Sequence, residues 1–151
     1  MKSILIIFIF SYIFSITEKD EQITQLVFIY NAKNGLVNGM FDYVHKFVSP
    51  ETYQCNLCSI TYDMGGKKDQ WTEYLNSLPL RVQFAYKNNI LKSNFNVNYK
   101  NQSLPCVFLI KDKKQSLILS SSEINKMETL DELKKILSKK LIKSNVLLDN
   151  N

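Results

Sequence analysis

Two cysteines three residues apart, Cys55 and Cys58, are the side chains in this sequence with the clearest capacity for chemistry. Thiols at this spacing can close a disulfide, exchange electrons with another thiol pair, or supply half of a metal site. The spacing by itself therefore leaves three interpretations open: a reversible redox pair, an inert structural pair, and part of a metal site.

A metal site would need more ligands than the pair supplies. Zinc in proteins is usually held by four ligands, and the sequence offers one further cysteine, Cys106, and one histidine, His45. Zinc on Cys55, Cys58 and His45 is the alternative to a site without any cofactor. We interpret Cys106 as a buried free thiol that packs like a small apolar residue, because it opens an apolar strand.

Other kinds of chemistry find little support in the residues. The run Gly65-Gly66-Lys67-Lys68 lacks the outer glycine and the serine or threonine of a phosphate-binding loop. Lysines crowd the C-terminal third, but no stacking motif accompanies them, and a solvated helix face explains them. We expect no nucleic acid partner; a protein thiol or disulfide is the expected partner, and the sequence does not specify an oligomeric state.

Residues 1–22 predict an export signal. Lys2 precedes the apolar run of residues 4–16, which is shorter than the roughly 20 residues that span a bilayer. On this interpretation the protein is periplasmic or secreted, with no stable membrane span after processing. The alternative is a buried first strand, since the run is rich in isoleucine and phenylalanine, and the protein would then be cytoplasmic.

The remaining chain predicts a single α/β domain, residues 23–143, with a flexible tail at 144–151. The apolar patterns predict strands at 26–30, 59–62, 80–86, 107–110 and 116–119, and helices at 36–48, 71–78 and 129–141. A capping box, Thr129 to Glu132, marks the start of the last helix. Cys55 and Cys58 would then stand where the second strand begins, with Cys55 the more exposed, attacking thiol and Cys58 the resolving one.

This order of elements, with Ser103-Leu104-Pro105 before a strand, a hairpin and a closing helix, resembles the thioredoxin-like architecture. The resemblance implies a mixed central sheet flanked by helices, parallel at its start and antiparallel near its end, and a cis bond before Pro105. Thioredoxins carry CxxC directly after the first strand, whereas residues 31–35 hold no thiol here. On the predicted order the pair lies at the opposite end of the sheet from the usual active site.

The chain also resembles a small bacterial family with no assigned activity. The shared pieces are Tyr30-Asn31-Ala32 with Gly35, His45-Lys46, Ser49-Pro50 with Thr52-Tyr53, and Cys55-x-Leu57-Cys58. The resemblance implies the thioredoxin-like fold and little more. The displaced CxxC itself predicts a thiol–disulfide redox role. The alternatives are a non-catalytic binding or structural module with a structural cysteine pair, and a small metal-binding protein.

Overall fold

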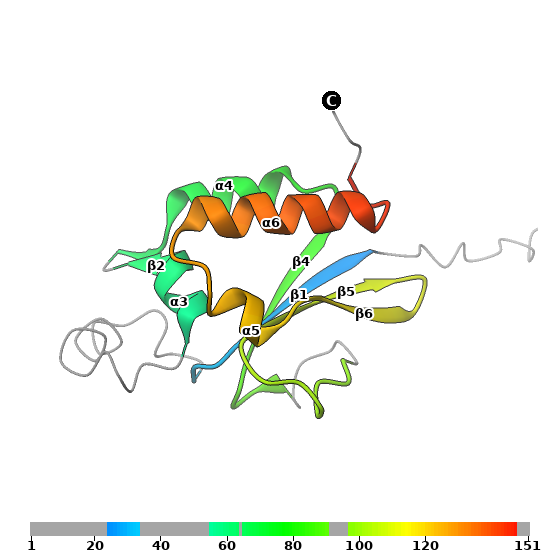
Figure 1. Cartoon of the computed structure of the whole chain (residues 1–151), viewed down its shortest axis with the longest axis horizontal. Helices are drawn as coiled ribbons and strands as arrows, with labels where there is room; N and C mark the ends of the chain where they lie inside the picture. Colours follow the sequence, from blue (N-terminus) through cyan, green and yellow to red (C-terminus); the bar gives the residue numbers. More distant parts are fainter. Residues whose placement is uncertain (1–23, 34–54, 64, 91–96, 148–151) are drawn as a thin grey trace, which may run out of the picture.

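A mixed four-stranded sheet forms the centre of the protein (Figure 1). The computed structural model describes residues 24–33, 55–63, 65–90 and 97–147. The strands lie in the order β4-β1-β5-β6, and β1 runs parallel to β4 and antiparallel to β5. Their bounds are Gln25–Tyr30 for β1, Arg81–Tyr86 for β4, Cys106–Lys111 for β5 and Lys114–Leu119 for β6. The mixed α/β class, the early parallel pairing and the late hairpin are confirmed.

β1 is one of the two inner strands, together with β5, and its sequence explains its place. Residues 26–30 are all fully buried, as a continuous apolar run requires when both faces of a strand are covered. Leu26, Phe28 and Tyr30 belong to the core on one face, while Val27 and Ile29 belong to the core on the other. Because side chains alternate between the two faces of a strand, β1 contributes to two separate cores.

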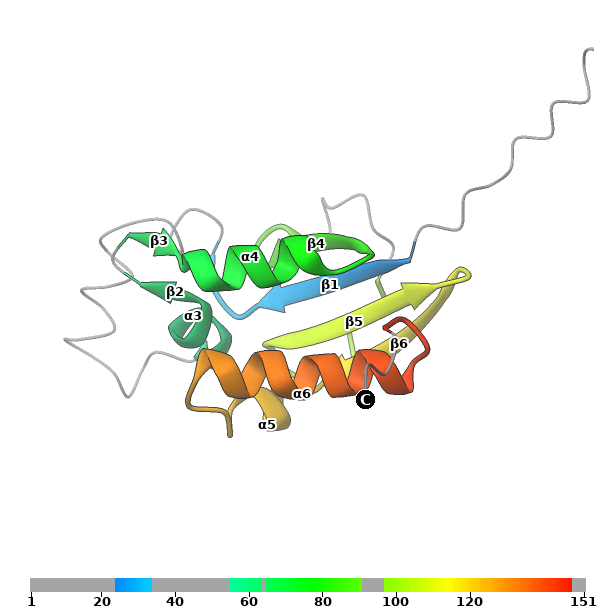
Figure 2. The same ribbon diagram turned by 90° about the horizontal axis from the view of Figure 1, so that it is seen from above.

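Two helices cover one face of the sheet (Figures 1 and 2). The helix α4, Asp69–Ser77, buries Trp71 and Leu75, as the apolar spacing predicts. The helix α6, Leu130–Lys143, begins at the predicted capping box, in which Thr129 accepts from the backbone of Glu132. The spacing predicts an apolar stripe of five residues. Leu130, Leu133, Leu137 and Leu141 are buried, and Ile136 is partly buried. The short helix α5, Ser121–Ile124, precedes it with a capping box of its own.

The described residues of the connection between β4 and β5, 87–90 and 97–105, lie on the far side of the sheet from α4 and α6 (Figure 1). The core on this face contains Val27, Ile29, Ala85, Ile90, Val97, Cys106 and Phe108. Described residues of this connection form turns and irregular backbone, as the asparagine-rich sequence predicts. One face of the sheet is therefore closed by helices and the other by a loop.

The predicted second strand at 59–62 is wrong. Residues Asn56–Thr61 form the helix α3, and Tyr62–Asp63 then pairs with Gly66–Lys67 as the small ribbon β2–β3. Leu57, Cys58, Ile60 and Thr61 form the buried face of α3. This spacing of one, three and four residues is helical, and it prevails over the strand preference of Ile60, Thr61 and Tyr62.

Several predictions fall outside the described residues. These are the export signal at 1–22, the helix at 36–48 with His45, and the last residues of the tail, 148–151. After α6 ends, Val146 and Leu147 pack, partly buried, against the helix-side core. Within the part of the chain that the structure describes, no helix is long and apolar enough to cross a membrane.

Candidate functional site

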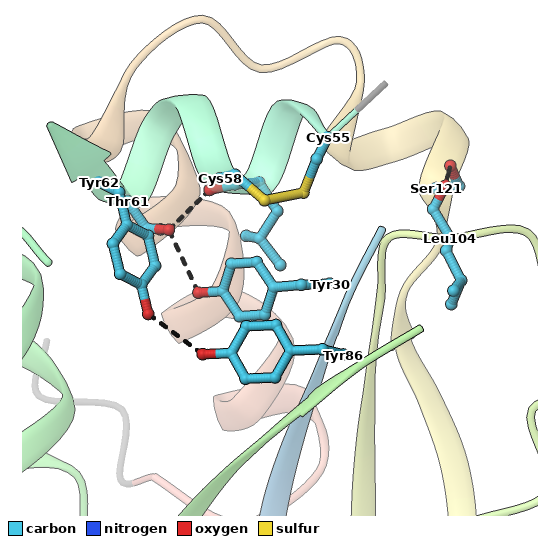
Figure 3. The surroundings of a disulfide bond; sticks show 9 residues. Tyr30, Cys55, Cys58, Thr61, Tyr62, Tyr86, Leu104 and Ser121 are labelled. Atoms are coloured by element: carbon cyan, nitrogen blue, oxygen red, sulfur yellow. Dashed lines mark hydrogen bonds between the residues drawn. A yellow bond between two sulfur atoms is a disulfide. The ribbon is translucent and has the colours of Figure 1, made fainter. Parts of the chain in front are cut away.

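Cys55 and Cys58 form a disulfide at the start of α3 (Figure 3). Cys55 is the residue that precedes the helix, and Cys58 lies in its first turn. Their Cα atoms are 5.3 Å apart. Three residues of extended strand would separate them by about 10 Å, beyond the reach of a disulfide, so the helical turn is what brings the sulfurs together.

The helix α3 lies at the carboxyl end of β1. The hydroxyl of Tyr30, the last residue of β1, donates to Thr61 Oγ1 over 3.2 Å, and Thr61 in turn donates to the carbonyl of Leu57 over 2.6 Å. The expectation that the pair stands at the opposite end of the sheet is therefore wrong. It assumed that the cysteines lead into a strand, whereas α3 belongs to the connection that leaves the carboxyl end of β1.

A second tether holds the other end of α3. The side-chain amide of Asn56 donates to the carbonyls of Ile124 and Met127, over 2.7 and 2.8 Å. A helix of six residues without a side-chain cap is too short to be stable by itself. Its position, and with it the position of both sulfurs, therefore depends on these contacts with β1 and with the α5–α6 segment.

The bond between Leu104 and Pro105 is cis, as the resemblance to the thioredoxin-like architecture implies. It directly precedes β5, whose first residue, Cys106, pairs with Ile29 near the carboxyl end of β1. Ser121 Oγ donates to the carbonyl of Leu104 over 2.9 Å and links this turn to α5. The cis bond and the disulfide helix thus share one end of the sheet (Figure 3).

Cys106 does not join the pair. It is a free thiol with no exposed surface, and it belongs to the loop-side core, whereas Cys55 and Cys58 belong to the helix-side core. Burial raises the pKa of the Cys106 thiol to about 12, which keeps it protonated at neutral pH. The interpretation of Cys106 as a buried apolar residue is confirmed.

The described residues bring no metal ligands to the cysteine pair. His45 lies outside the described ranges, and within those ranges no three histidine, cysteine, aspartate or glutamate side chains stand close enough to hold a metal ion. The zinc alternative on Cys55, Cys58 and His45 accordingly stays a prediction.

Neither sulfur is open to solvent. Cys55 is 2% exposed and Cys58 is 1% exposed, so both are buried, and the greater accessibility of Cys55 in the reduced protein stays a prediction. Both residues belong to the helix-side core, and Asn56 joins the start of α3 to the α5–α6 segment. Exchange with a partner therefore requires a local movement of α3 or of its neighbours.

Three tyrosines surround the base of α3. The ring of Tyr30 stacks on Tyr86 with centroids 5.5 Å apart and meets Tyr62 edge-on at 5.9 Å. The hydroxyls of Tyr62 and Tyr86 are 3.5 Å apart. Burial raises the pKa of Tyr30 and of Tyr62, so both phenols stay neutral.

Tyr30 and Tyr86, which lie at the carboxyl-terminal end of α3, are not among the residues that the sequence predicts for the site. Each is the last residue of a strand, and β1 and β4 are parallel, so both side chains arrive at one end of the sheet. The parallel pairing was the signal that could have placed them there.

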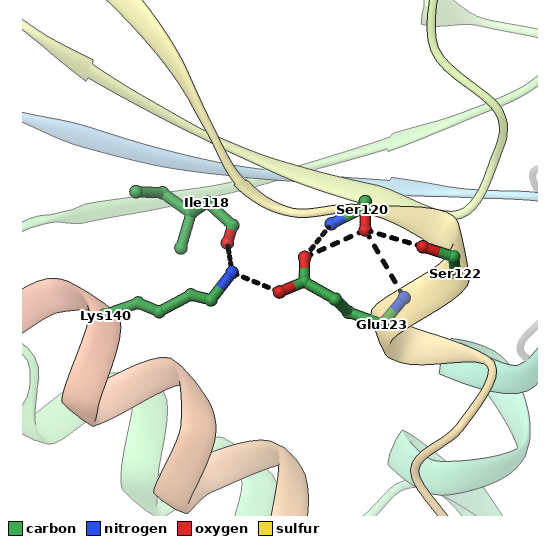
Figure 4. A network of polar contacts seen from close by, with 5 residues as sticks. All are labelled: Ile118, Ser120, Ser122, Glu123 and Lys140. Carbon is green, nitrogen blue, oxygen red and sulfur yellow. Dashed lines mark hydrogen bonds and ion pairs between the residues drawn. The ribbon is translucent and has the colours of Figure 1, made fainter.

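A polar network fixes the segment that receives Asn56 (Figure 4). Lys140 of α6 donates to the carbonyl of Ile118 and to the carboxylate of Glu123, which also accepts from the backbone and hydroxyl of Ser120. The hydrogen bond from Lys140 is the main cause that lowers the pKa of Glu123 to about 2. The network ties α6 to α5 and so holds the carbonyl of Ile124 in place.

Comparison with known proteins does not assign this site. No protein-family model matches the chain, and neither a curated protein nor a solved structure gives a match. The resemblance to thioredoxin-like proteins and to the small bacterial family therefore stays a prediction from sequence. The function has to be argued from the residues themselves.

Proposed function

We propose that the protein is a thioredoxin-like thiol–disulfide protein in which Cys55 and Cys58 alternate between dithiol and disulfide. The observation that supports this most directly is the position of the cysteine pair in the fold. The pair stands at the start of the first helix that the structure describes after β1, at the carboxyl end of that strand. Thioredoxins carry their CxxC at the start of the helix that follows the first strand, so the displacement along the sequence is not a displacement to the other end of the sheet.

The proposed reaction is a two-electron exchange with a disulfide of a protein partner. One thiolate of the reduced pair attacks a sulfur of the partner disulfide, which forms a mixed disulfide and releases one partner thiolate. The second cysteine then attacks the sulfur of the first, closes the Cys55–Cys58 bond and releases the other partner thiol. The pair loses two electrons and two protons, and the partner gains them. Cys55 as the attacking residue stays a prediction.

The burial of both sulfurs favours a second candidate, a structural pair in a non-catalytic binding module. Cys55 and Cys58 would then brace the first turn of α3, which has no side-chain cap. Structural disulfides resist reduction by glutathione, whereas labile or catalytic ones have higher reduction potentials. The reduction potential therefore separates the two candidates.

The test is a redox titration of the folded protein in glutathione buffers, read by alkylation and mass spectrometry. A redox pair should show a midpoint within the range that glutathione can set, above about −300 mV. In the same series, Cys58→Ser should trap a mixed disulfide on Cys55, and Cys106→Ala should titrate like the unchanged protein. A pair that stays oxidised in every buffer would remove the redox function and leave the structural one.

Metal analysis of the reduced protein tests the zinc alternative, which one bound equivalent would support.

A further inference from the structure

A cavity of about 320 Å³ lies between α4 and the edge strand β4. Leu75 and Leu78 line it on the side of α4, and Val82 and Phe84 line it on the side of β4. None of its lining residues comes from α3, so the cavity is separate from the cysteine site. Its volume is near the lower limit of the pockets that hold small ligands, about 300 to 1,000 Å³.

A single cation, Lys67 of β3, also lines this cavity. Its Nζ atom lies 3.8 Å from the centre of the Phe84 ring, and partial burial lowers the pKa of the ammonium group. Among the residues that the structure describes, no carboxylate forms an ion pair with Lys67. An ammonium group has three donors, and the face of one ring does not use them all.

The lining therefore combines an apolar wall with an ammonium group that lacks an anion. We propose that the cavity binds a small monocarboxylate with an apolar body, its carboxylate on Lys67 and its body against Leu75, Leu78 and Val82.

The charge of the site selects the ligand class. One lysine balances one negative charge, whereas a phosphate group carries more charge and is usually held by arginine or by a row of backbone amides. No arginine lines the cavity. The volume suits a free small molecule. The carboxyl terminus of a peptide is the competing ligand, and it is an outcome of the test.

The experiment is an NMR titration of the full-length ¹⁵N-labelled protein with phenylacetate, and phenylacetamide is the uncharged matched ligand. Phenylacetate should shift the amides of β3, α4 and β4 at concentrations up to about 10 mM, and phenylacetamide should bind at least about tenfold more weakly. Lys67→Met keeps the aliphatic stem over Phe84 and removes the charge, and it should weaken phenylacetate binding by about tenfold or more. Lys68→Met, at a neighbouring lysine that does not line the cavity, should bind like the unchanged protein.

The spectrum of each variant without ligand shows whether it is folded. No amide shifts with phenylacetate, equal binding of acid and amide, or unchanged binding by folded Lys67→Met would each overturn the proposal. Equal weakening in both lysine variants would overturn it too, because it would indicate only the general charge of the surface. A peptide carboxyl terminus that binds at least about tenfold more tightly than phenylacetate would replace the small molecule as the ligand.

Discussion

The two faces of the sheet hold their cysteines in opposite ways. On the face closed by helices, Cys55 and Cys58 are joined in a disulfide, and the helix that carries them is tethered by Asn56 and Thr61. On the face closed by the β4–β5 connection, Cys106 is a free thiol packed among apolar side chains. All three are buried, so burial does not distinguish a candidate redox pair from an inert residue.

The difference lies in the neighbours. The pair is surrounded by hydrogen-bonded groups that can be changed one at a time, whereas the surroundings of Cys106 are apolar. On the loop side, the described polar contacts include the mutual hydrogen bonds of Asn98 and Gln115, and both of these residues are exposed. The helix side should therefore respond to polar substitutions and the loop side should not.

The largest expected difference between the faces is in thiol reactivity. In the unreduced protein, Cys106 is the one cysteine of the three that can be alkylated, and its pKa of about 12 should slow alkylation about a thousandfold relative to an ordinary thiol. The measurement is mass spectrometry after iodoacetamide treatment near pH 7.5, with denatured protein as the control. Rapid labelling of Cys106 in the folded protein would contradict its placement.

Loss of the disulfide should be the next largest effect. The loop that it closes is short, so the double variant Cys55→Ser with Cys58→Ser should lose about 2 kcal/mol of unfolding free energy. Cys106→Ala removes one buried sulfur and should cost about 1 kcal/mol. Urea unfolding followed by the fluorescence of Trp71 measures both. A larger loss at Cys106 would reverse the comparison between the faces.

Removal of the Asn56 hydrogen bonds should cause the next largest loss of unfolding free energy. Asn56→Ala deletes two hydrogen bonds to backbone carbonyls and should cost about 1.5 kcal/mol, and faster reduction of the disulfide should accompany the loss. Asn125→Ala, which deletes one long, part-buried hydrogen bond to Ser121, is the control and should cost less than about 0.5 kcal/mol. Urea unfolding and the rate of reduction by dithiothreitol give the two values. Equal effects of the two variants would mean that α3 is not held by this tether.

Removal of a single hydroxyl group at the other end of α3 should cost less stability. Tyr30→Phe keeps the buried ring and removes the hydrogen bond to Thr61, at a cost of about 1 kcal/mol. Tyr99→Phe, on the loop-covered face, is the matched change and should be close to neutral. Thermal unfolding compares them, and a neutral Tyr30→Phe would show that ring packing alone positions α3.

The smallest expected effect is a dependence on pH. The pKa of Glu123 is about 2 in the folded protein and has its ordinary value near 4.3 in the unfolded chain. Its contribution to stability is therefore complete above about pH 4.5 and disappears as the pH falls towards 2. The carboxylate is partly exposed, so we expect less than about 1 kcal/mol, measured as the difference between the unchanged protein and Glu123→Gln. A constant difference from pH 6 to pH 2 would contradict the network.

The parts of the fold that the sequence predicts correctly are those with local signals. The continuous apolar run of β1 lies within that strand, and the capping box of α6 stands directly at the start of that helix. The helix α3 is short, and Ile60, Thr61 and Tyr62 favour strands, so its conformation is decided by contacts with residues far along the chain.

Contacts between distant residues also decide the geometry of the site. The side-chain amide of Asn56 donates to carbonyls of residues 68 and 71 positions later, and no pattern near Cys55 indicates that contact. The equal burial of the two cysteines follows from it and could not be predicted. The cavity at Lys67 was missed for a similar reason, because it exists only where the β2–β3 ribbon, α4 and β4 meet.

The position of β1 in the sheet has a consequence for how the chain folds. β1 is the first strand in sequence among those that the structure describes, yet both of its neighbours come much later, at residues 81–86 and 106–110. During synthesis its apolar residues leave the ribosome long before either neighbour is present to cover them. Sheets that depend on such distant pairings fold slowly and expose apolar, aggregation-prone segments during folding. A nascent chain that ends before β5 should therefore bind chaperones through residues 26–30 and release them once β5 is available.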